Sequence, residues 1–234
     1  MKQISTIFLF FGLLPLSLKA QQLEIRANLN SGLYSYRGAG AESVSRINSA
    51  TYTNNPYGSK GGLSYGLSFN IRKVTKHQFI YGADLGYEML RSRVNLEYQD
   101  VIGDIASSFK GNTYLNNSFI NLFPYMGGRF LLSKRTFDIV GGMDIGYILS
   151  STEKGDAKST DNAAFHIQTS IDRLNRKSDL RPRIQLSTEF DHGIGVYIAY
   201  SHGIQNYKEK VLGGGKSDTY SRMWRFGLSY RLKS

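Results

Sequence analysis

His166 is the residue of this 234-residue chain best placed for nucleophilic catalysis, because Asp161, Ser170 and Asp172 lie near it in sequence. Together these residues could form a Ser/His/Asp set for acyl transfer. No spacing fixes their mutual geometry, however, and polar residues of a solvated loop explain them better. The chain has no cysteine, and neither a metal-ligand spacing nor a Gly-rich phosphate cradle is present. We therefore expect a protein that is not an enzyme and that needs no cofactor or metal.

Charged residues that alternate with apolar ones form a second set of candidate functional residues. Inside a membrane protein such charges must pair, because an isolated buried charge is costly. They would then form either a salt-bridged plug or the lining of a narrow selective pore, and we favour the plug. The predicted network comprises Arg26, Asp84, Glu88, Arg129, Asp144, Arg183, Glu189 and Arg225, with Glu24, Arg72, Asp138 and Arg231 on the same face.

The elements that carry these charges have a period of two. Residues 62–72, for example, set Leu63, Leu67 and Ile71 on one face against Ser64 and Arg72 on the other. This alternation indicates β-strands with one apolar face. Eight such segments are predicted, at 23–36, 62–72, 78–90, 118–131, 137–149, 180–190, 194–207 and 223–234.

The connections between these segments alternate between long and short. The long ones lie at about 37–61, 91–113, 150–179 and 207–219, and tight turns join the other segments. This rhythm is typical of an up-and-down barrel whose periplasmic turns are short and whose outer loops are long. We predict an all-β fold, a transmembrane antiparallel up-and-down β-barrel of eight strands. Its last strand must close against the first, because an open edge cannot lie in hydrocarbon.

Two parts of the chain have separate features. Residues 1–20 combine Lys2, an apolar run from Ile4 to Leu18 and Ala20, which is the pattern of a secretory signal peptide. We therefore divide the chain into a signal peptide, 1–20, and a barrel domain, 21–234. The segment 150–179 fits a helical face and a strand extension equally well, and the sequence does not decide between them.

Outward-facing aromatic residues are expected to form two belts, as barrels have at their two membrane interfaces. The outer belt would contain Tyr65, Tyr87, Tyr147, Tyr200 and Tyr220. The periplasmic belt would contain Phe69, Phe79, Tyr81, Phe137, Phe190 and Tyr230.

A family resemblance appears in the second half of the chain. The segments that carry it are "SFINLFPYMGGRF", "FDIVGGMDIGYILS", "DLRPRIQLSTEF", "GVYIAYSHGIQNY" and "RMWRFGLSYRL". The succession of strand and turn patterns resembles the PorT-type outer-membrane β-barrel proteins of Bacteroidetes. The resemblance implies an eight-stranded barrel of the Gram-negative outer membrane, and some members of the family act in envelope secretion.

The expected function is a structural or protein-interaction role in the outer membrane, for example in envelope assembly or secretion. The alternative is a small pore for ions or solutes, and a surface enzyme acting on lipid or peptide is the least favoured. The net charge of +11 suggests affinity for anionic lipopolysaccharide. Other envelope proteins are the second expected class of partner, reached through the outer loops. Positive and negative charges are mixed in those loops, which argues against nucleic-acid binding.

Overall fold

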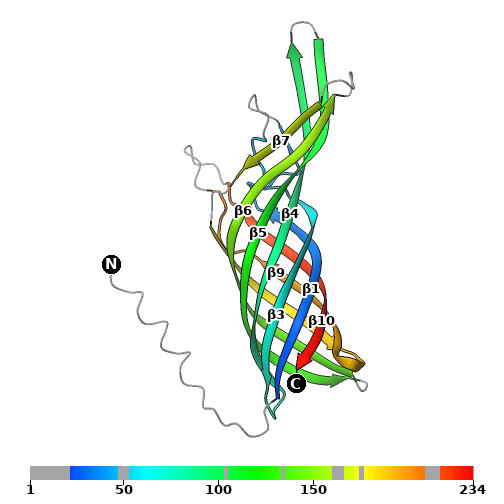
Figure 1. Ribbon diagram of the computed structural model, residues 1–234. Helices are drawn as coiled ribbons and strands as arrows, with labels where there is room; N and C mark the ends of the chain where they lie inside the picture. Colours follow the sequence, from blue (N-terminus) through cyan, green and yellow to red (C-terminus); the bar gives the residue numbers. More distant parts are fainter. Residues whose placement is uncertain are drawn as a thin grey trace, which may run out of the picture.

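Eight strands of this computed structural model form a closed antiparallel barrel (Figure 1). The structure describes residues 22–46, 53–102, 105–132, 135–159, 166–173, 177–208 and 217–233, so the predicted signal peptide lies outside the described residues. In order around the barrel the strands are β1 (Gln22–Arg37), β3 (Lys60–Val74), β4 (Phe79–Ile102), β5 (Ile105–Leu132), β6 (Arg135–Ser159), β8 (Ser178–Glu189), β9 (Ile194–His202) and β10 (Tyr220–Lys233). The prediction of an eight-stranded up-and-down barrel is confirmed.

The first and last strands close the barrel, as Ala27 pairs with Tyr230 and Leu33 with Trp224. Following the paired residues once around the barrel from Glu24 leads back to β1 at Tyr34, ten residues further along. A stagger of this size inclines the strands to the barrel axis, typically by about 35–45°. Eight strands enclose a space that side chains can fill.

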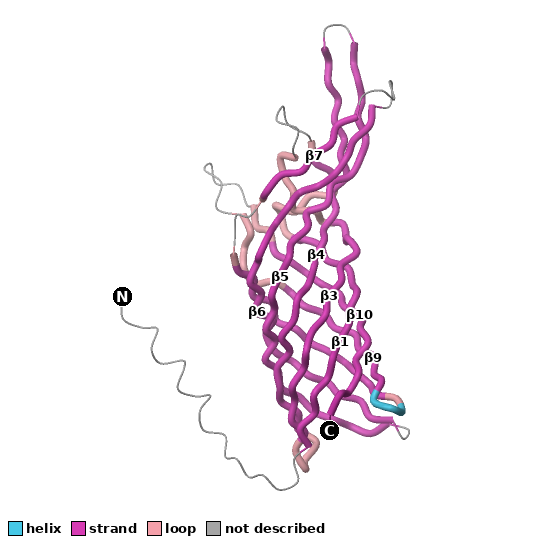
Figure 2. Tube along the Cα trace, viewed as in Figure 1, coloured by secondary structure: helices cyan, strands magenta, loops and turns pink. Residues whose placement is uncertain are grey.

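The short connections gather at one end of the barrel and the long ones at the other (Figure 2). A four-residue turn, Thr75–Gln78, joins β3 to β4, and a 3-10 turn, Asp191–Gly193, joins β8 to β9. Strand β10 ends at this same end of the barrel (Figure 1). The opposite end carries the connections that follow β1 and β9.

Strands β4, β5 and β6 rise far above the barrel, which corrects one prediction. Residues 91–113 were expected to be an irregular loop, but β4 and β5 stay paired from Phe79 and Gly128 up to Ile102 and Ile105. The physical reason is that alternation continues beyond the barrel, with Leu96 and Phe109 buried together with Ala157 on one face. The charges between them occupy the other face, so their polarity did not mark the end of a strand.

Segment 150–179 proves to be extended where the structure describes it. Strand β6 continues to Ser159, and β7 (His166–Asp172) pairs with it. A short strand, β2 (Val44–Ser45), runs parallel to β4 at Asn95 and Leu96. Strand β9 ends at His202, five residues before the predicted end. The barrel is therefore continued on one side by a raised sheet of order β2–β4–β5–β6–β7.

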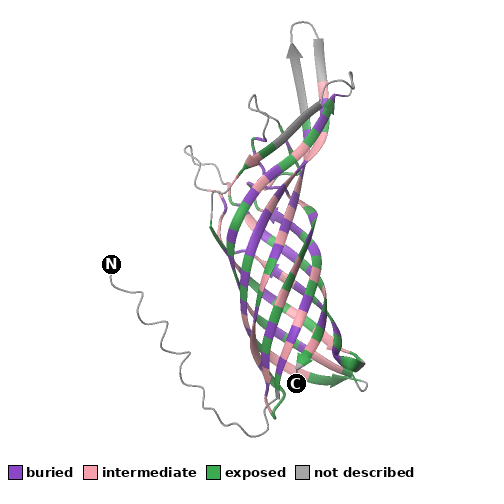
Figure 3. Ribbon diagram, viewed as in Figure 1, coloured by how far each residue is buried: buried purple, intermediate pink, exposed green. Residues whose placement is uncertain are grey.

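Burial alternates along the barrel strands (Figure 3). Outward side chains such as Leu29, Leu63 and Leu228 are 58–64% exposed, whereas inward Glu24, Asp144 and Arg225 are fully buried. The apolar face therefore points outward and the polar face inward, the reverse of a soluble protein. Among the described residues, no helix is long and apolar enough to cross a membrane.

Candidate functional site

The interior of the barrel holds two clusters of ion pairs. The first, the end cluster, lies near the short turns, since its members come from the beginning of β1 and β6 and the end of β8 and β10. It consists of Glu24, Arg26, Arg72, Arg129, Asp138, Glu189 and Arg231.

Glu24 is the hub of the end cluster. Its carboxylate lies 2.6 Å from Arg26, 2.7 Å from Arg72 and 3.3 Å from Arg129. Arg72 and Arg129 also contact Asp138, each at 2.8 Å. Strands β1, β3, β5 and β6 are thus joined across the lumen by two carboxylates. Glu189 extends the cluster from β8, because it accepts a hydrogen bond from Arg26 and lies 2.9 Å from Arg231 on β10.

The second, the central cluster, lies deeper in the barrel. It consists of Asp84, Glu88, Asp144, Asp179, Arg181, Arg183 and Arg225. Arg225 lies between two carboxylates, 2.6 Å from Glu88 and 2.9 Å from Asp144. Asp144 also lies 3.3 Å from Arg183 and 3.7 Å from Arg181. Each of these charges is desolvated, so the mutual attraction of the pairs must offset the cost of their burial.

The two clusters together contain seven arginines and seven carboxylates, so the described interior is formally neutral. The eight residues of the predicted network all lie in it. Arg181 and Asp179 were missing from that network. Arg181 lies two residues before Arg183 along β8, so the alternation that places Arg183 inside the barrel also places Arg181 there. Asp179 was assigned to a loop, but β8 begins at Ser178.

Side chains fill the space around the central cluster. The guanidinium of Arg183 lies 4.1 Å from the ring centre of Phe123, and that of Arg181 lies 4.9 Å from the ring centre of Phe119. The remaining cavity beside Asp84, Asp144 and Arg183 has a volume of about 20 Å³. A space of this size has room for about one water molecule, so the described side chains leave little free volume beside these three residues.

An aromatic layer covers the central cluster at the end with the long loops. Tyr34 and Tyr36 of β1 meet Tyr57 and Tyr207 from the loops, with edge-to-face ring contacts at 5.0–5.9 Å. Asn117 donates a hydrogen bond of 2.9 Å to the Tyr36 hydroxyl. Burial raises the pKa of the Tyr207 hydroxyl well above its usual range, because a phenolate is poorly solvated there. Two tyrosines from the loops thus pack against two tyrosines of β1 at this end of the barrel.

The aromatic residues predicted to form belts lie on the outer face of the barrel strands. Phe79 lies beside Tyr81 at 6.3 Å near the short turns. Near the other rim, Tyr200 lies 4.8 Å from Trp224. Phe69 pairs with Ala27 and Leu85 in mid-strand. The others, Tyr65, Tyr87, Tyr147, Tyr220, Phe137, Phe190 and Tyr230, lie on the same outer face.

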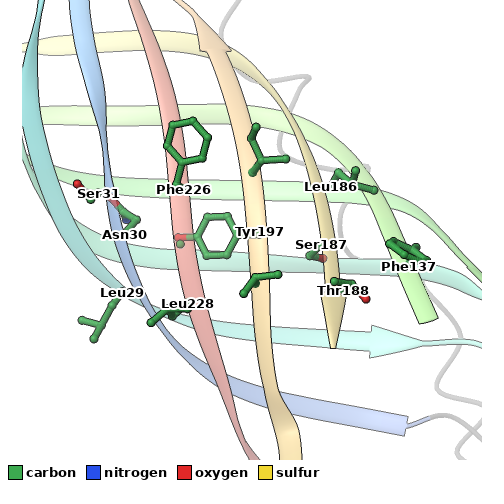
Figure 4. Close-up of a pocket in the computed structure, with 13 residues that line it drawn as sticks. Leu29, Asn30, Ser31, Phe137, Leu186, Ser187, Thr188, Tyr197, Phe226 and Leu228 are labelled. Atoms are coloured by element: carbon green, nitrogen blue, oxygen red, sulfur yellow. The ribbon is translucent and has the colours of Figure 1, made fainter. Parts of the chain in front are cut away.

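A hollow interrupts the outer surface over β8, β9, β10 and β1 (Figure 4). It has a volume of about 660 Å³, and outward Leu186, Phe226 and Leu228 contribute to its apolar lining. Tyr197, labelled in Figure 4, is among the residues around the hollow, and its ring packs closely against Gly227. Outward apolar surface of this kind is suited to contact with acyl chains.

The possible catalytic residues of the sequence are not brought together. His166, Ser170 and Asp172 follow one another along β7 and pair with Lys158, Lys154 and Thr152 of β6. Ser170 lies four positions beyond His166 along the strand, which is roughly 13 Å at 3.3 Å per residue, and a relay needs hydrogen-bond distance. Asp161 lies outside the described residues. Within the described ranges, no group of His, Asp and Glu residues is arranged to hold a metal ion.

The comparisons with known proteins give distant structural similarities. No family model matches the chain, and no curated protein matches it. Ail, the attachment invasion locus protein of Yersinia pestis, solved with the heparin analogue sucrose octasulfate, is 11% identical over 91% of this chain and 99% of its own, with a TM-score of 0.34. Neisserial surface protein A is 7% identical over 92% and 100%, with a TM-score of 0.35. A Pseudomonas aeruginosa FadL homologue is 9% identical over 91% and 90%, with a TM-score of 0.25.

Proposed function

We propose that this chain is a non-enzymatic integral protein of a Gram-negative outer membrane, with a structural or protein-interaction role at the cell envelope. The outer surface of the barrel supports the membrane location. Most outward side chains in the lower part of the eight strands are apolar, and the closed ring of strands satisfies the backbone hydrogen bonds between neighbours. These are the two conditions that a hydrocarbon environment imposes on a β-structure.

The outward face of β6 changes character along its length, which supports a membrane boundary. Ile139, Ile145 and Leu149 are exposed apolar residues in the lower part of β6. After a register shift between Ser118 and Phe119 of the paired strand, the outward residues include exposed Lys154 and Lys158. Charged side chains are costly in the bilayer and tolerated at its interface. We place the outer membrane surface at this change.

The filled and neutral interior is the observation that carries the functional proposal. Every arginine of the two clusters has a carboxylate partner, and the cavity beside the central cluster holds about one water. A conducting pore needs a hydrated path from one mouth to the other. The interior is therefore best explained as a structural plug, and it disfavours the pore alternative.

The raised sheet supports an interaction role. Strands β4, β5 and β6 have 24, 28 and 25 residues, whereas about 9–11 residues cross a bilayer. The excess length of these strands projects beyond the boundary on one side of the barrel (Figure 1). We infer that this sheet contacts other components of the envelope.

The finer assignments follow from the sequence. We propose that the chain belongs to the PorT-type family of Bacteroidetes, that residues 1–20 are a cleaved signal peptide, and that both ends of the barrel domain are periplasmic. Lipopolysaccharide and other envelope proteins are the proposed partners. The sequence resemblance, the apolar start of the chain and the short turns beside the end of β10 support these proposals.

Planar-bilayer conductance tests the plug directly. The refolded protein is first checked by gel electrophoresis with and without boiling, because a folded barrel and its unfolded chain migrate differently. We expect the folded protein to give no discrete conductance steps. Discrete channels whose ion selectivity changes in Asp144→Asn or Arg225→Gln would contradict the plug and make transport the leading function.

A further inference from the structure

Arg37, Arg222 and His202 converge on the outer surface of the barrel, at the rim where the long loops begin. Arg222 on β10 pairs with Ser35 of β1 on one side and with His202 of β9 on the other. Arg37, two residues beyond Ser35, contacts the Nε2 atom of His202 through its guanidinium. Three strands thus bring two arginines and a histidine into one surface patch, which we call the rim patch.

The rim patch lacks the carboxylates that neutralise the interior. Among the described residues, Arg37 and Arg222 form no ion pair, whereas the seven interior arginines all do. Arg222 donates to the Ser35 hydroxyl at 2.8 Å and to the Ser59 carbonyl at 3.4 Å, which are neutral acceptors. The Nε atom of Arg37 is buried and has no hydrogen-bond partner among the described residues. The patch therefore has positive charge and donor capacity that the described chain leaves uncompensated.

Aromatic and apolar residues lie directly below the rim patch. The Tyr200 hydroxyl contacts Nδ1 of His202 at 3.0 Å, and its ring lies 4.8 Å from Trp224. Trp224 pairs with Leu33, which is 51% exposed. The outward face of β10 then continues downward through Phe226 and Leu228. From the rim downward, the surface thus presents positive groups, then aromatic rings, then aliphatic side chains. A lipid leaflet has the matching order of phosphate groups, interface and acyl chains.

We propose that the rim patch binds the phosphate group of an outer-leaflet lipid, with Arg37 and Arg222 as its principal ligands. A phosphate accepts several charge-assisted hydrogen bonds from guanidinium groups, and among the described residues no carboxylate competes with it for Arg37 and Arg222. The acyl chains of the lipid would continue over Trp224 and Phe226. This inference rests on the proposed membrane location, and it adds the site and the chemistry by which the barrel recognises a lipid.

Trp224 provides the readout for a test, because it is the one tryptophan of the chain and lies directly below the rim patch. The folded protein in zwitterionic detergent is titrated with diphosphorylated lipid A while tryptophan fluorescence is recorded. We expect saturable binding that weakens roughly fivefold in Arg37→Gln and in Arg222→Gln, as expected for about 1 kcal/mol per surface arginine. The double variant should lose roughly 25-fold. Dephosphorylated lipid A should bind as weakly to the wild type as diphosphorylated lipid A binds to the double variant.

Arg135→Gln is the matched control. Arg135 is exposed at the opposite rim and lies 5.2 Å from the ring centre of Phe190, much as Arg37 lies 5.4 Å from that of Tyr220. Its substitution should leave lipid A binding unchanged. Equal binding by the wild type and the double variant would overturn the inference, and so would displacement of lipid A by millimolar inorganic phosphate, which would indicate a site for a soluble anion. Every variant should also show a gel shift on boiling, which confirms a folded barrel. Loss of lipid A binding by a folded variant would then bear on the rim patch alone, whereas failure of the barrel to fold in lipid would contradict the proposed function as well.

Discussion

Arg225 shows how single residues hold the interior together. Its guanidinium lies between Glu88 and Asp144, and all three side chains are buried. Replacing it with glutamine leaves two carboxylates close together without their shared cation. We expect Arg225→Gln to lower the free energy of unfolding by about 3–5 kcal/mol, measured by urea titration in lipid vesicles.

The control for Arg225 is an arginine of the same interior in a wetter place. Arg231 lies at the barrel end with its side chain 31% exposed, and Glu189 is its ion-pair partner. Arg231→Gln should cost at most about 1 kcal/mol, because solvent screens the pair. The double variant Glu88→Gln, Arg225→Gln should recover part of the loss. Equal costs for the two arginine variants would contradict the view that the central cluster is a desolvated plug.

Gly227 illustrates a packing constraint between inward positions of neighbouring strands. The ring of Tyr197 lies over this glycine, and a Cβ at position 227 would come within 2.1 Å of the ring carbon Cζ. We expect Gly227→Ala to lower the free energy of unfolding by about 1–3 kcal/mol, because the rigid ring must move. Gly128→Ala is the control, since its Cβ would meet only the Gln78 carbonyl oxygen, at 4.0 Å.

A double-mutant cycle separates this contact from a general effect of alanine. In a Tyr197→Ser background, Gly227→Ala should cost no more than about 0.5 kcal/mol, since the obstructing ring is gone. An undiminished cost in that background would show that backbone conformation, and not the ring, requires glycine at this position. Both measurements use the same urea titration.

At the scale of the strands, the alternation of residues was sufficient to predict the barrel but not its upper limit. Residues 137–149, whose outward face is apolar, were predicted as a strand and form the lower part of β6. Beyond residue 149 the outward face becomes charged. This change was interpreted as the start of a loop, although β6 continues to Ser159. The length of these strands is determined by pairing among β4, β5 and β6, and the pattern of a single sequence does not show which strands pair. For the same reason the sequence indicated inward charges but not their partners.

The raised part of the β4–β5 hairpin should be separable from the barrel. Val94 pairs with Thr113, so a two-residue Asn-Gly turn can join them and replace residues 95–112. We expect this variant to keep the gel shift on boiling. Its free energy of unfolding should stay within about 1 kcal/mol of the wild-type value, because the ion-pair clusters and the aromatic layer lie below the replaced residues. Loss of the gel shift would contradict this separation and make the raised sheet part of the folding unit.

At the scale of the whole molecule, the position of charged and apolar surface predicts an orientation that can be tested in cells. Lys154 is exposed on the raised sheet, and Lys76 is exposed in the short turn between β3 and β4. If the raised sheet is outside the cell, these residues lie on opposite sides of the outer membrane. The chain contains no cysteine, so Lys154→Cys and Lys76→Cys each introduce a unique thiol.

A membrane-impermeant maleimide should label Lys154→Cys on intact cells, while Lys76→Cys should react only after the outer membrane is permeabilised. The expectation follows from the cost of moving charged loops across hydrocarbon, which leaves the long and charged extensions on one side and the tight turns on the other. Both variants should show the same gel shift on boiling, which confirms that each is a folded barrel. Labelling of Lys76→Cys alone on intact cells would reverse the orientation and place the tyrosine layer, the raised sheet and the rim patch on the periplasmic side. The rim patch would then face a different lipid leaflet, so this measurement also determines which lipids can reach it.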